Sequence, residues 1–516
     1  MDEGESRESI VMFPFMAHGH LNPFMSLARR LGQRKGYVVT IVNTPLNIQK
    51  LKSSLPCKTN IHLAEIPFNG TEYGLPPKAE NTDTLSYEFI GRLMEASEKL
   101  ESPFKNLIIN IAKKEGNFPL CIISDMFLAW TVKVANELGI FHSVFIAGAA
   151  YSMGIYFSLS LNTNQRGTEE EFALLDFPEA AKLHQSQLGT DLKYTDAIAS
   201  LFRFRERQFL LCLRSDAILL NSIEELEQIG AKYFRRKTGG KPVWMVGPAC
   251  SIAKEDESTQ QGTLTKRLSS NFNDLSSWLD AHPPGSVLYV SFGSHNTILA
   301  SQMKELAMGL EASGVAFIWV IRPPLGFNVT EEPKADEWLP DGFEERIKKS
   351  NQGILVRQWA PQAEILSHKS TGAFLSHCGW NSVLESLCHG VPIIGWPLAG
   401  EQFFNSQLLE KEVGVCLEIA RGIKTAVVEQ GHIAGTINLV IGKTVKGEQM
   451  RRSVREIQQK MEDAILERGD FKGSSVKAMD EFLLRAAIWT KKKHSVDSEQ
   501  VSNGTEYYFH FTKATS

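Results

Sequence analysis

The sequence predicts an α/β protein made of two domains, each with a parallel sheet covered by helices. Short runs rich in Val, Ile and Phe alternate with segments in which apolar residues recur at helical spacing, which is typical of βαβ units. The alternation stops once, in a polar stretch at residues 251–274, and then resumes. A chain of 516 residues is long enough for two or three such domains.

The first series of predicted strands lies before residue 250. After the first of them, Phe24, Leu27, Ala28 and Leu31 share one face at helical spacing and predict an amphipathic helix. Strands that are covered on both faces read as continuous apolar runs, and the runs of this series fit that description. They are "SIVMFPF" (9–15), "YVVTIVN" (37–43), "LCIISD" (120–125), "SVFIAG" (143–148) and "AILLNS" (217–222).

Residues 251–274 contain few large apolar side chains and predict an interdomain linker. A second strand series follows: "SVLYVSFGS" (286–294), "AFIWVIR" (316–322), "GILVRQW" (353–359), "TGAFLSH" (371–377) and "VPIIGWP" (391–397). We therefore expect an N-terminal domain over 1–250 and a C-terminal domain over 275–470. A helix over 471–490 should pack back on the N-terminal domain, and a loosely ordered tail should occupy 491–516.

The composition is that of an ordinary globular chain, with 22% charged and 43% hydrophobic residues and a formal net charge of −4. There is no long basic stripe, so nucleic acid is not an expected partner. Seven cysteines without a C-x-x-C pair predict reduced thiols. The acidic start "MDEGESRES" is not a secretory signal, and no run of 18 apolar residues predicts a membrane span. We expect a cytoplasmic monomer.

One stretch, "AFLSHCGWNSVLES" at residues 373–386, joins a buried strand to a helix through polar residues. Free amides at a helix N-terminus form a ready anion site, and His377, Asn381 and Ser382 add side-chain donors there. Gly379 permits a close backbone approach. These residues predict a diphosphate site. The alternative is a capping box, in which Ser382 caps the helix and Glu385 caps it back.

Neighbouring residues could complete a nucleotide site. The loop "SFGS" at residues 291–294 could reach the same phosphates, or it could be an ordinary turn. Trp359 could stack on a base, although a core position is an equally good interpretation. Glu385 could accept hydrogen bonds from ribose hydroxyls. No G-x-G-x-x-G follows a strand and no P-loop is present, which disfavours NAD binding and P-loop phosphoryl transfer.

A second polar cluster, "MAHGHLNPF" at residues 16–24, follows the first strand. Asn22 is a plausible N-cap and Pro23 suits the first helical position, which places His20 just before a helix. The positive end of the helix dipole should help to keep His20 neutral and therefore basic. His18 and His20 also form an H-x-H pair, which could instead bind metal in a hydrolase, but no further cluster has ligand spacing.

Asp125 ends the predicted strand at residues 120–125. It could simply cap the following helix. It could also orient a histidine and stabilise the imidazolium that forms when that histidine removes a proton from a hydroxyl.

The stretch from Trp359 to Gln402, "WAPQAEILSHKSTGAFLSHCGWNSVLESLCHGVPIIGWPLAGEQ", resembles the 44-residue signature box of plant family 1 UDP-sugar-dependent glycosyltransferases, without a gap. "HGHLNP", "SFGS" and the strand order are also similar to this family, over roughly residues 8–489. The resemblance implies the GT-B fold, in which two Rossmann-like domains face each other. It places the donor on the C-terminal domain and the acceptor on the N-terminal domain.

The resemblance also implies a role for each matched residue. His20 would be the catalytic base and Asp125 its acidic partner. The implied donor site has Trp359 on uracil with the Ala360 backbone at its edge, Gln362 and Glu385 on the ribose, Ser294, His377, Asn381 and Ser382 on the diphosphate, and Trp380, Glu401 and Gln402 at the sugar.

The implied reaction is the inverting transfer of glucose from UDP-glucose to a hydroxyl of a small apolar acceptor such as a flavonoid, phenolic or terpenoid. It needs no metal and no other cofactor. Glu401 and Gln402 can pair with the equatorial hydroxyls of glucose, and glucuronate is not expected because no matched sugar-site residue is basic. The alternative is a catalytically silent sugar-nucleotide or small-molecule binding protein on the same fold.

Two positions depart from the family pattern. Residues 147–150, Ala-Gly-Ala-Ala, lack the hydroxyl that contacts the sugar in many relatives, which leaves that contact open. His18 stands where relatives often have glutamine, and its role is also open.

Overall fold

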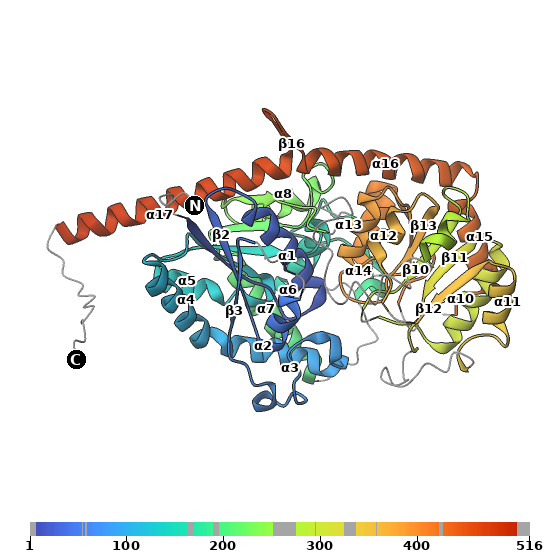
Figure 1. Cartoon of the computed structure of the whole chain (residues 1–516), viewed down its shortest axis with the longest axis horizontal. Coiled ribbons are helices and arrows are strands. Elements are labelled where there is room, and N and C mark those ends of the chain that lie inside the picture. The colour runs from blue at the N-terminus through green and yellow to red at the C-terminus, as the bar shows by residue number, and fades with distance from the viewer. Residues whose placement is uncertain are drawn as a thin grey trace.

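The structure, a computed structural model, describes residues 7–53, 55–56, 59–162, 170–188, 196–250, 275–294, 296–324, 337–357, 359–422 and 427–502. The predicted linker at 251–274 lies outside these residues, as does the end of the predicted tail from residue 503. Two α/β domains lie side by side, blue to green for the N-terminal one and yellow to orange for the C-terminal one (Figure 1). The predicted fold class is confirmed.

The N-terminal sheet has seven parallel strands in the order β3-β2-β1-β4-β5-β8-β9. Ile10 and Met12 of β1 pack into one apolar layer, whereas Val11 and Phe13 pack into the other, and all four are fully buried. Burial on both faces explains why the sequence of β1 shows no polar alternation. The strands are β1 (Glu8–Phe13), β2 (Tyr37–Asn43), β3 (Ile61–Glu65), β4 (Cys121–Asp125), β5 (Phe141–Ile146), β8 (Ala217–Leu220) and β9 (Val243–Met245).

Helices cover both faces of this sheet (Figure 1). Phe24, Leu27, Ala28 and Leu31 of α1 are fully buried, as their spacing predicts. The helices are α1 (His18–Gly32), α2 (Pro45–Lys52), α3 (Tyr87–Ser97), α4 (Glu101–Glu115), α5 (Thr131–Leu138), α6 (Ala150–Leu161), α7 (Asp196–Cys212) and α8 (Gln228–Lys237). The short turns η2 (Thr82–Thr84) and η4 (Met126–Leu128) lie near the site described below.

The C-terminal sheet has six parallel strands in the order β12-β11-β10-β13-β14-β15. The strands are β10 (Val287–Ser291), β11 (Ala316–Val320), β12 (Gly353–Val356), β13 (Thr371–Ser376), β14 (Ile393–Gly395) and β15 (Cys416–Glu418). The helices around it are α10 (Ala300–Ser313), α11 (Phe343–Lys349), α12 (Gln362–Ser367), α13 (Trp380–Cys388), α14 (Gln402–Gln407), α15 (Gln430–Ile441) and α16 (Val445–Ile465), with a π-helical turn at Leu408–Val413.

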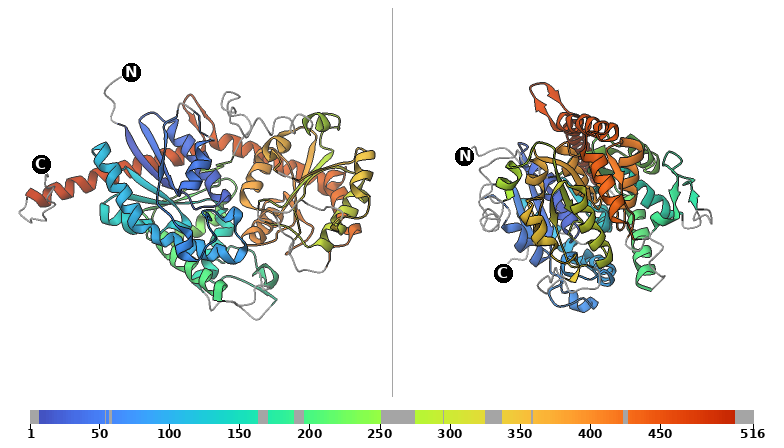
Figure 2. Two further views of the ribbon diagram at one scale, coloured as in Figure 1. Left: turned by 60° about the horizontal axis from the view of Figure 1, so that its bottom comes forward. Right: turned by 90° about the vertical axis from the view of Figure 1, so that its right-hand side faces the viewer.

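The last helix, α17 (Ser474–Ser502), returns to the N-terminal domain, and α16 and α17 run along one side of both domains (Figures 1 and 2). Phe482 and Trp489 of α17 pack against Phe141 of β5, with ring centroids 6.1 and 5.9 Å apart. The helix continues beyond residue 490, where the sequence analysis ended it. Trp489 packs on Phe141 at that predicted end, so the helix is still in contact with the N-terminal domain there.

The start of α1 differs from the sequence prediction. Asn22 is not an N-cap and Pro23 is not in the first turn, because the helix begins at His18 with Ala17 as its N-cap. His20 is therefore inside the first turn of the helix rather than before it. A proline normally marks the start of a helix because it cannot donate a hydrogen bond to the carbonyl four residues earlier. Here that carbonyl, on Gly19, has another donor: Asn381 Nδ2 lies 2.9 Å from it.

The sequence analysis also missed three strands at or near the sheet edges: β3, β9 and β15. Strands β9 and β15 contain only three residues each, and in β3 only Ile61 is buried. Such short or half-exposed segments carry little apolar signal of their own, so their pairing partners define them.

Candidate active site

Each sheet has a point at which the strand order reverses, and open α/β sheets bind ligands outside the carboxyl ends of the strands at such points. The reversal lies between β1 and β4 in the N-terminal sheet, and between β10 and β13 in the C-terminal sheet. The segment after β1 carries His20, and β4 ends at Asp125. The segments after β10 and β13 carry the 291–294 loop and His377. The predicted residues of these four segments thus lie at the two switch points.

His20 and Asp125 form a direct pair. His20 Nδ1 lies 2.7 Å from Asp125 Oδ2, and the Asp125 side chain has no exposed surface. A carboxylate can only accept a hydrogen bond, so Nδ1 carries the proton and the lone pair is on Nε2. The other oxygen, Asp125 Oδ1, accepts from the Phe127 amide at 2.9 Å and caps the η4 turn. One oxygen of Asp125 therefore caps the turn, and the other accepts the hydrogen bond that orients His20.

The pKa of His20 is raised above its usual value. Burial alone lowers it, but the charge of Asp125 and its hydrogen bond outweigh burial, and Glu401 adds a smaller upward effect. The expectation that the helix dipole keeps this imidazole neutral is therefore wrong in its net direction, because the adjacent carboxylate dominates. The pair favours a protonated His20 after proton transfer, which suits a base that must hold the proton it removes.

His18 has a carboxylate of its own. Its Nε2 lies 2.8 Å from Asp83 Oδ2 on η2, while His20 faces Asp125. The two histidines of the H-x-H motif are thus each paired with a different carboxylate. Among the described residues, no group of three or more His, Cys, Asp or Glu side chains is arranged to hold a metal ion.

His377 lies between two glycines. A Cβ atom on Gly293 or on Gly379 would come within 2.6 or 2.5 Å of His377 Nε2. Gly293 also has a φ of +75°, which disfavours a side chain independently. The imidazole thus closes the space between the loop after β10 and the start of α13. The sequence prediction that both segments could reach one phosphate group is consistent with this packing.

Gln362, Ser382 and Glu385 form one hydrogen-bonded cluster. Gln362 Nε2 donates to Ser382 Oγ at 3.0 Å and to Glu385 Oε2 at 2.7 Å. Burial raises the pKa of Glu385 to about 7. The capping-box alternative is wrong: α13 begins at Trp380 with Gly379 as its N-cap, so Ser382 and Glu385 both lie inside the helix.

Trp359 is 55% exposed, so the alternative that it belongs to the core is wrong. Its strand, β12, ends at Val356, three residues earlier than the segment predicted from sequence. An exposed indole beside the Gln362 cluster offers a flat face to a ligand. Ala360 next to it is buried, and the carbonyl of Ser294 is held by the Arg322 guanidinium.

Two consecutive residues of α13 bind the N-terminal domain. The Trp380 indole is buried and donates from Nε1 to the Asn221 carbonyl at 2.7 Å. Asn381 donates to the Gly19 carbonyl at 2.9 Å. The helix predicted to bind diphosphate is therefore docked directly on the turn that carries His20. The indole nitrogen of Trp380 is used between the domains, so any sugar contact of this residue must come from other atoms.

Glu401 and Gln402 lie at the start of α14. Burial raises the pKa of Glu401, and the charges of His20 and Arg205 oppose that shift, which places both cations close to it. Gln402 Oε1 accepts from the amides of Leu398 and Ala399, both at 3.0 Å. The Gln402 oxygen thus stabilises its own turn, and Nε2 is the part of the amide left to meet a sugar hydroxyl.

The sequence analysis missed Glu227, which binds the end of the segment at residues 147–150 that lacks the family hydroxyl. Its two oxygens accept from the amides of Ala150 and Tyr151, at 3.0 and 2.8 Å, at the start of α6. The N-cap, Ala149, has no side chain able to do this. Glu227 lies 76 residues further along the chain, so no local motif reveals it. Burial raises its pKa to about 7.

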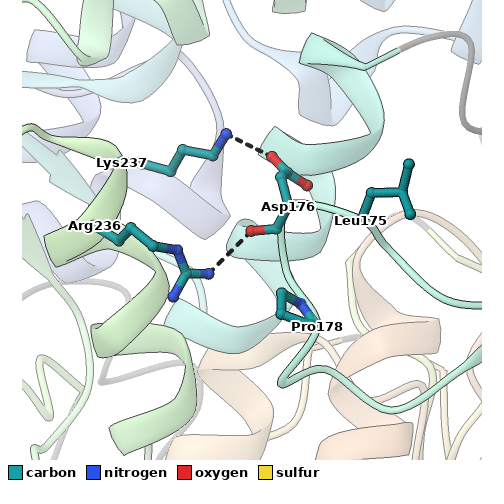
Figure 3. A pocket seen from close by; sticks show the side chains of 5 residues that line it. All are labelled: Leu175, Asp176, Pro178, Arg236 and Lys237. Atoms are coloured by element: carbon teal, nitrogen blue, oxygen red, sulfur yellow. Dashed lines mark hydrogen bonds and ion pairs between the residues drawn. The ribbon is translucent and has the colours of Figure 1, made fainter.

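A separate groove of about 540 Å³ lies on the N-terminal domain, lined by Leu175, Asp176, Pro178, Arg236 and Lys237 (Figure 3). Lys237 Nζ lies 2.6 Å from the Asp176 carboxylate, and Arg236 donates to the Asp176 carbonyl and pairs with Glu179. Both cations are thus compensated within the groove. We assign no ligand to it.

Comparisons with known proteins identify the family of the chain. The family model described as "Glycosyltransferase, N-terminal domain" matches residues 7–250, and "UDP-glucoronosyl and UDP-glucosyl transferase" matches residues 262–453. UDP-glycosyltransferase 92A1 of Arabidopsis thaliana is 43% identical over 486 residues, covering 93% of this chain and 97% of that protein. Crocetin glucosyltransferase 3 of Crocus sativus is 40% identical over 441 residues, covering 82% and 90%.

Solved structures of the same fold include Glycyrrhiza uralensis UGT73P12 complexed with glycyrrhetinic acid 3-O-monoglucuronide. It has a TM-score of 0.78 at 27% identity and covers 96% of this chain and 99% of that chain. Phytolacca americana UGT2 complexed with UDP-2fluoro-glucose and pterostilbene has a TM-score of 0.73 at 28% identity, covering 93% and 100%. Within the described residues, no helix combines the length and apolarity needed to span a membrane.

The fold, with its switch points facing across two parallel-sheet domains, defines a glycosyltransferase of the GT-B class. The curated relatives match nearly the whole length of the chain, at identities that extend well beyond the signature box. The chain belongs to the plant UDP-glycosyltransferase family, whose members act on small molecules.

Proposed function

We propose that this enzyme transfers glucose from UDP-glucose to a hydroxyl of a small apolar acceptor, with inversion at the anomeric carbon. The observation that carries the proposal is the pair formed by His20 and Asp125, whose atoms lie 2.7 Å apart. Gly19, next to His20, accepts a hydrogen bond from Asn381, at the start of the helix that also carries Ser382. A base and a diphosphate site must lie this close together for a hydroxyl to attack a bound sugar nucleotide.

In this mechanism the free lone pair of His20 Nε2 accepts the acceptor's hydroxyl proton as the oxygen attacks the anomeric carbon. Asp125 stabilises the imidazolium that forms and holds its tautomer through Nδ1. The new bond forms on the face opposite the departing UDP, so the α-linked donor gives a β-linked product. The proton ends on His20 and the electron pair of the broken bond ends on the diphosphate.

The donor would lie along the C-terminal switch point. Trp359 and Ala360 would hold uracil, Gln362 and Glu385 the ribose, and Ser294, His377, Asn381 and Ser382 the diphosphate, with Trp380, Glu401 and Gln402 at the sugar. Amides at the start of α13 and the side-chain donors there would stabilise the charge of the leaving diphosphate. We propose that no metal is required.

The acceptor would lie on the side of His20 that faces the N-terminal domain, among aromatic rings. Phe15 and Phe127 approach the His20 ring with centroid distances of 5.6 and 5.3 Å, and Phe127 in turn contacts Phe204 of α7. An apolar wall beside a base favours an apolar hydroxyl compound. Relatives include a scopoletin glucosyltransferase and a flavonoid 3-O-glucosyltransferase, which supports this acceptor class without naming the compound.

The test is His20→Ala assayed with UDP-glucose and simple alcohols as well as phenols. Loss of a general base should lower turnover about 10²- to 10⁴-fold while UDP binding, measured by calorimetry, is unchanged. His62→Ala, at an exposed histidine of the same domain, is the matched control. Near wild-type turnover on an alcohol would reject the base. Wild-type protein that binds UDP but transfers to no hydroxyl compound would favour the silent binding protein.

Two further assays complete the proposal. Proton NMR of the product reports the anomeric configuration, and an α-glucoside would contradict inversion. Activity that disappears with a chelator and returns with a divalent cation would contradict metal independence. The domain boundaries, cytoplasmic location, monomeric state and lack of nucleic-acid binding stay predictions.

A further inference from the structure

The guanidinium of Arg205, on α7, contacts two aromatic rings but no charged group among the residues that the structure describes. The guanidinium carbon lies 4.6 Å from the centre of the Phe202 ring and 5.3 Å from that of Tyr156. Its Nε is enclosed and has no hydrogen-bond partner. Among the residues that the structure describes, Arg205 makes no hydrogen bond and no ion pair. By contrast, Arg207 on the same helix pairs with Glu98.

Arg205 lies close to the start of α14 in the C-terminal domain. Tyr156, one of its two rings, packs against Phe404 at 5.6 Å, and its hydroxyl lies 3.6 Å from a Cβ placed on Gly400. The guanidinium therefore stands beside the turn that carries Glu401 and Gln402. Burial raises the pKa of Glu401, and the charges of Arg205 and His20 both oppose that rise, so each cation lies within electrostatic reach of Glu401.

Phe204, next to Arg205 in the sequence, is connected to His20 through one further aromatic ring. Phe204 is fully buried and contacts Phe127, and Phe127 contacts the His20 ring at 5.3 Å. A ligand with its hydroxyl at His20 would extend along these aromatic rings toward Arg205. Glu401 lies within electrostatic reach of the guanidinium and of a second cation, His20.

A planar guanidinium with unused N–H groups, stacked on aromatic rings, is well suited to bind a carboxylate through two parallel hydrogen bonds. We propose that Arg205 determines acceptor specificity by binding a carboxylate at the end of the acceptor opposite to its reacting hydroxyl. This inference rests on the proposed function and narrows it: the acceptor is an apolar hydroxy acid rather than a neutral compound. The sequence analysis considered only the matched sugar-site residues and found none of them basic.

The test compares hydroxy acids with their primary amides, which have nearly the same size but no charge. The probes are 4-hydroxybenzoate, 4-hydroxyphenylacetate and 4-hydroxycinnamate, whose increasing length allows for the distance from His20 to Arg205. Binding of each acid and amide to the UDP-saturated enzyme is measured by calorimetry, which needs no turnover. We expect at least one acid to bind about 10- to 100-fold more tightly than its amide, the range for a charged hydrogen-bonded pair.

Arg205→Met should remove this difference by weakening the acid alone, because Met keeps apolar packing on Tyr156 and Phe202. Arg205→Lys should keep part of the difference between acid and amide, because the Lys ammonium still supplies a positive point charge. Arg203→Met removes an exposed cation from the same helix and should keep all of it. Equal binding of acids and amides to wild type, or a preference that survives Arg205→Met, overturns the proposal.

One further experiment distinguishes the two molecules that could supply the carboxylate, the acceptor and the sugar of UDP-glucuronate. If Arg205→Met lowers the use of UDP-glucuronate relative to UDP-glucose but leaves acid binding unchanged, the cation serves the donor and the acceptor proposal is wrong. Failure of the proposed function has a different signature, since no glucoside would then form from any hydroxyl compound, whatever the binding data.

Discussion

The Nδ2 atom of Asn381 lies 2.9 Å from the carbonyl oxygen of Gly19, and this hydrogen bond joins the two halves of the active site. In an uninterrupted helix the Gly19 carbonyl would accept from the amide of residue 23. Residue 23 is a proline and has no amide hydrogen, so the carbonyl is left for a donor from the other domain. A proline in α1 thereby couples the segment that carries His20 to the helix of the proposed diphosphate site.

Pro23→Ala restores the missing amide and should compete with Asn381 for the Gly19 carbonyl. We expect turnover to fall about 2- to 10-fold, since one hydrogen bond contributes roughly 0.5–1.5 kcal/mol, while the thermal stability of the protein is unchanged or higher. In an Asn381→Ala background, Pro23→Ala should have no further effect. Additive losses in this double-mutant cycle would show that the two residues act independently.

Asp125→Asn should lower kcat/KM strongly and shift its pH dependence. Because Asp125 raises the pKa of His20, wild-type activity should increase with pH through a value above the usual 6.5. The variant lacks the carboxylate, so the same rise should occur at lower pH, to a much lower plateau. An amide NH₂ facing Nδ1 also favours the tautomer whose Nε2 is protonated and cannot accept a proton.

The control for this experiment is Asp125→Ala, which removes the η4 cap as well as the pair. If the Asn variant unfolds at the same temperature as wild type and has the wild-type pH profile, capping is the only role of Asp125. If the Ala variant alone is unstable, the cap and the catalytic pair can be assigned to separate oxygens.

Glu385 should make donor binding dependent on pH. Its pKa is raised to about 7, and ribose hydroxyls would donate to the ionised form. UDP-glucose, measured without acceptor, should therefore bind more tightly as pH rises toward 7, by up to about tenfold per unit, and should release a proton on binding. Glu385→Gln should flatten this dependence. Calorimetry in two buffers of different ionisation enthalpy counts the proton, and an unchanged slope in the variant would exclude Glu385 as its source.

Gln402 should influence the choice of donor through its amide nitrogen. The oxygen already accepts from two backbone amides, so Gln402→Glu keeps an acceptor for them, replaces the donor with an oxygen and adds a negative charge beside Glu401. We expect the preference for UDP-glucose over UDP-galactose to fall by roughly tenfold, the cost of leaving one polar group unpaired. The two donors compete at equal concentration, and Gln402→Ala shows what loosening the turn contributes. If the wild-type enzyme uses both donors equally, the proposal that UDP-glucose is its donor is wrong.

The sequence by itself determined the fold class and most of the strands. The parallel strands of both sheets are buried on two faces, so their composition marks them wherever they are long enough, as in β1 and β13. The signature box placed His377, Asn381 and Glu385 on one strand–helix unit because these residues are local in the chain. The same locality made His20 visible between the first strand and the first helix, and Asp125 visible at the end of its strand.

Only the tertiary structure decided how these residues are used. Asp125 pairs with His20 across 105 residues, Asn381 reaches Gly19 across 362, and Glu227 caps α6 from 76 residues away. The start of α1 was misplaced for the same reason, since the donor that compensates Pro23 comes from another domain. Local sequence specifies which groups each segment presents, but hydrogen-bond partners are chosen by packing, and packing depends on contacts that no short window of sequence contains.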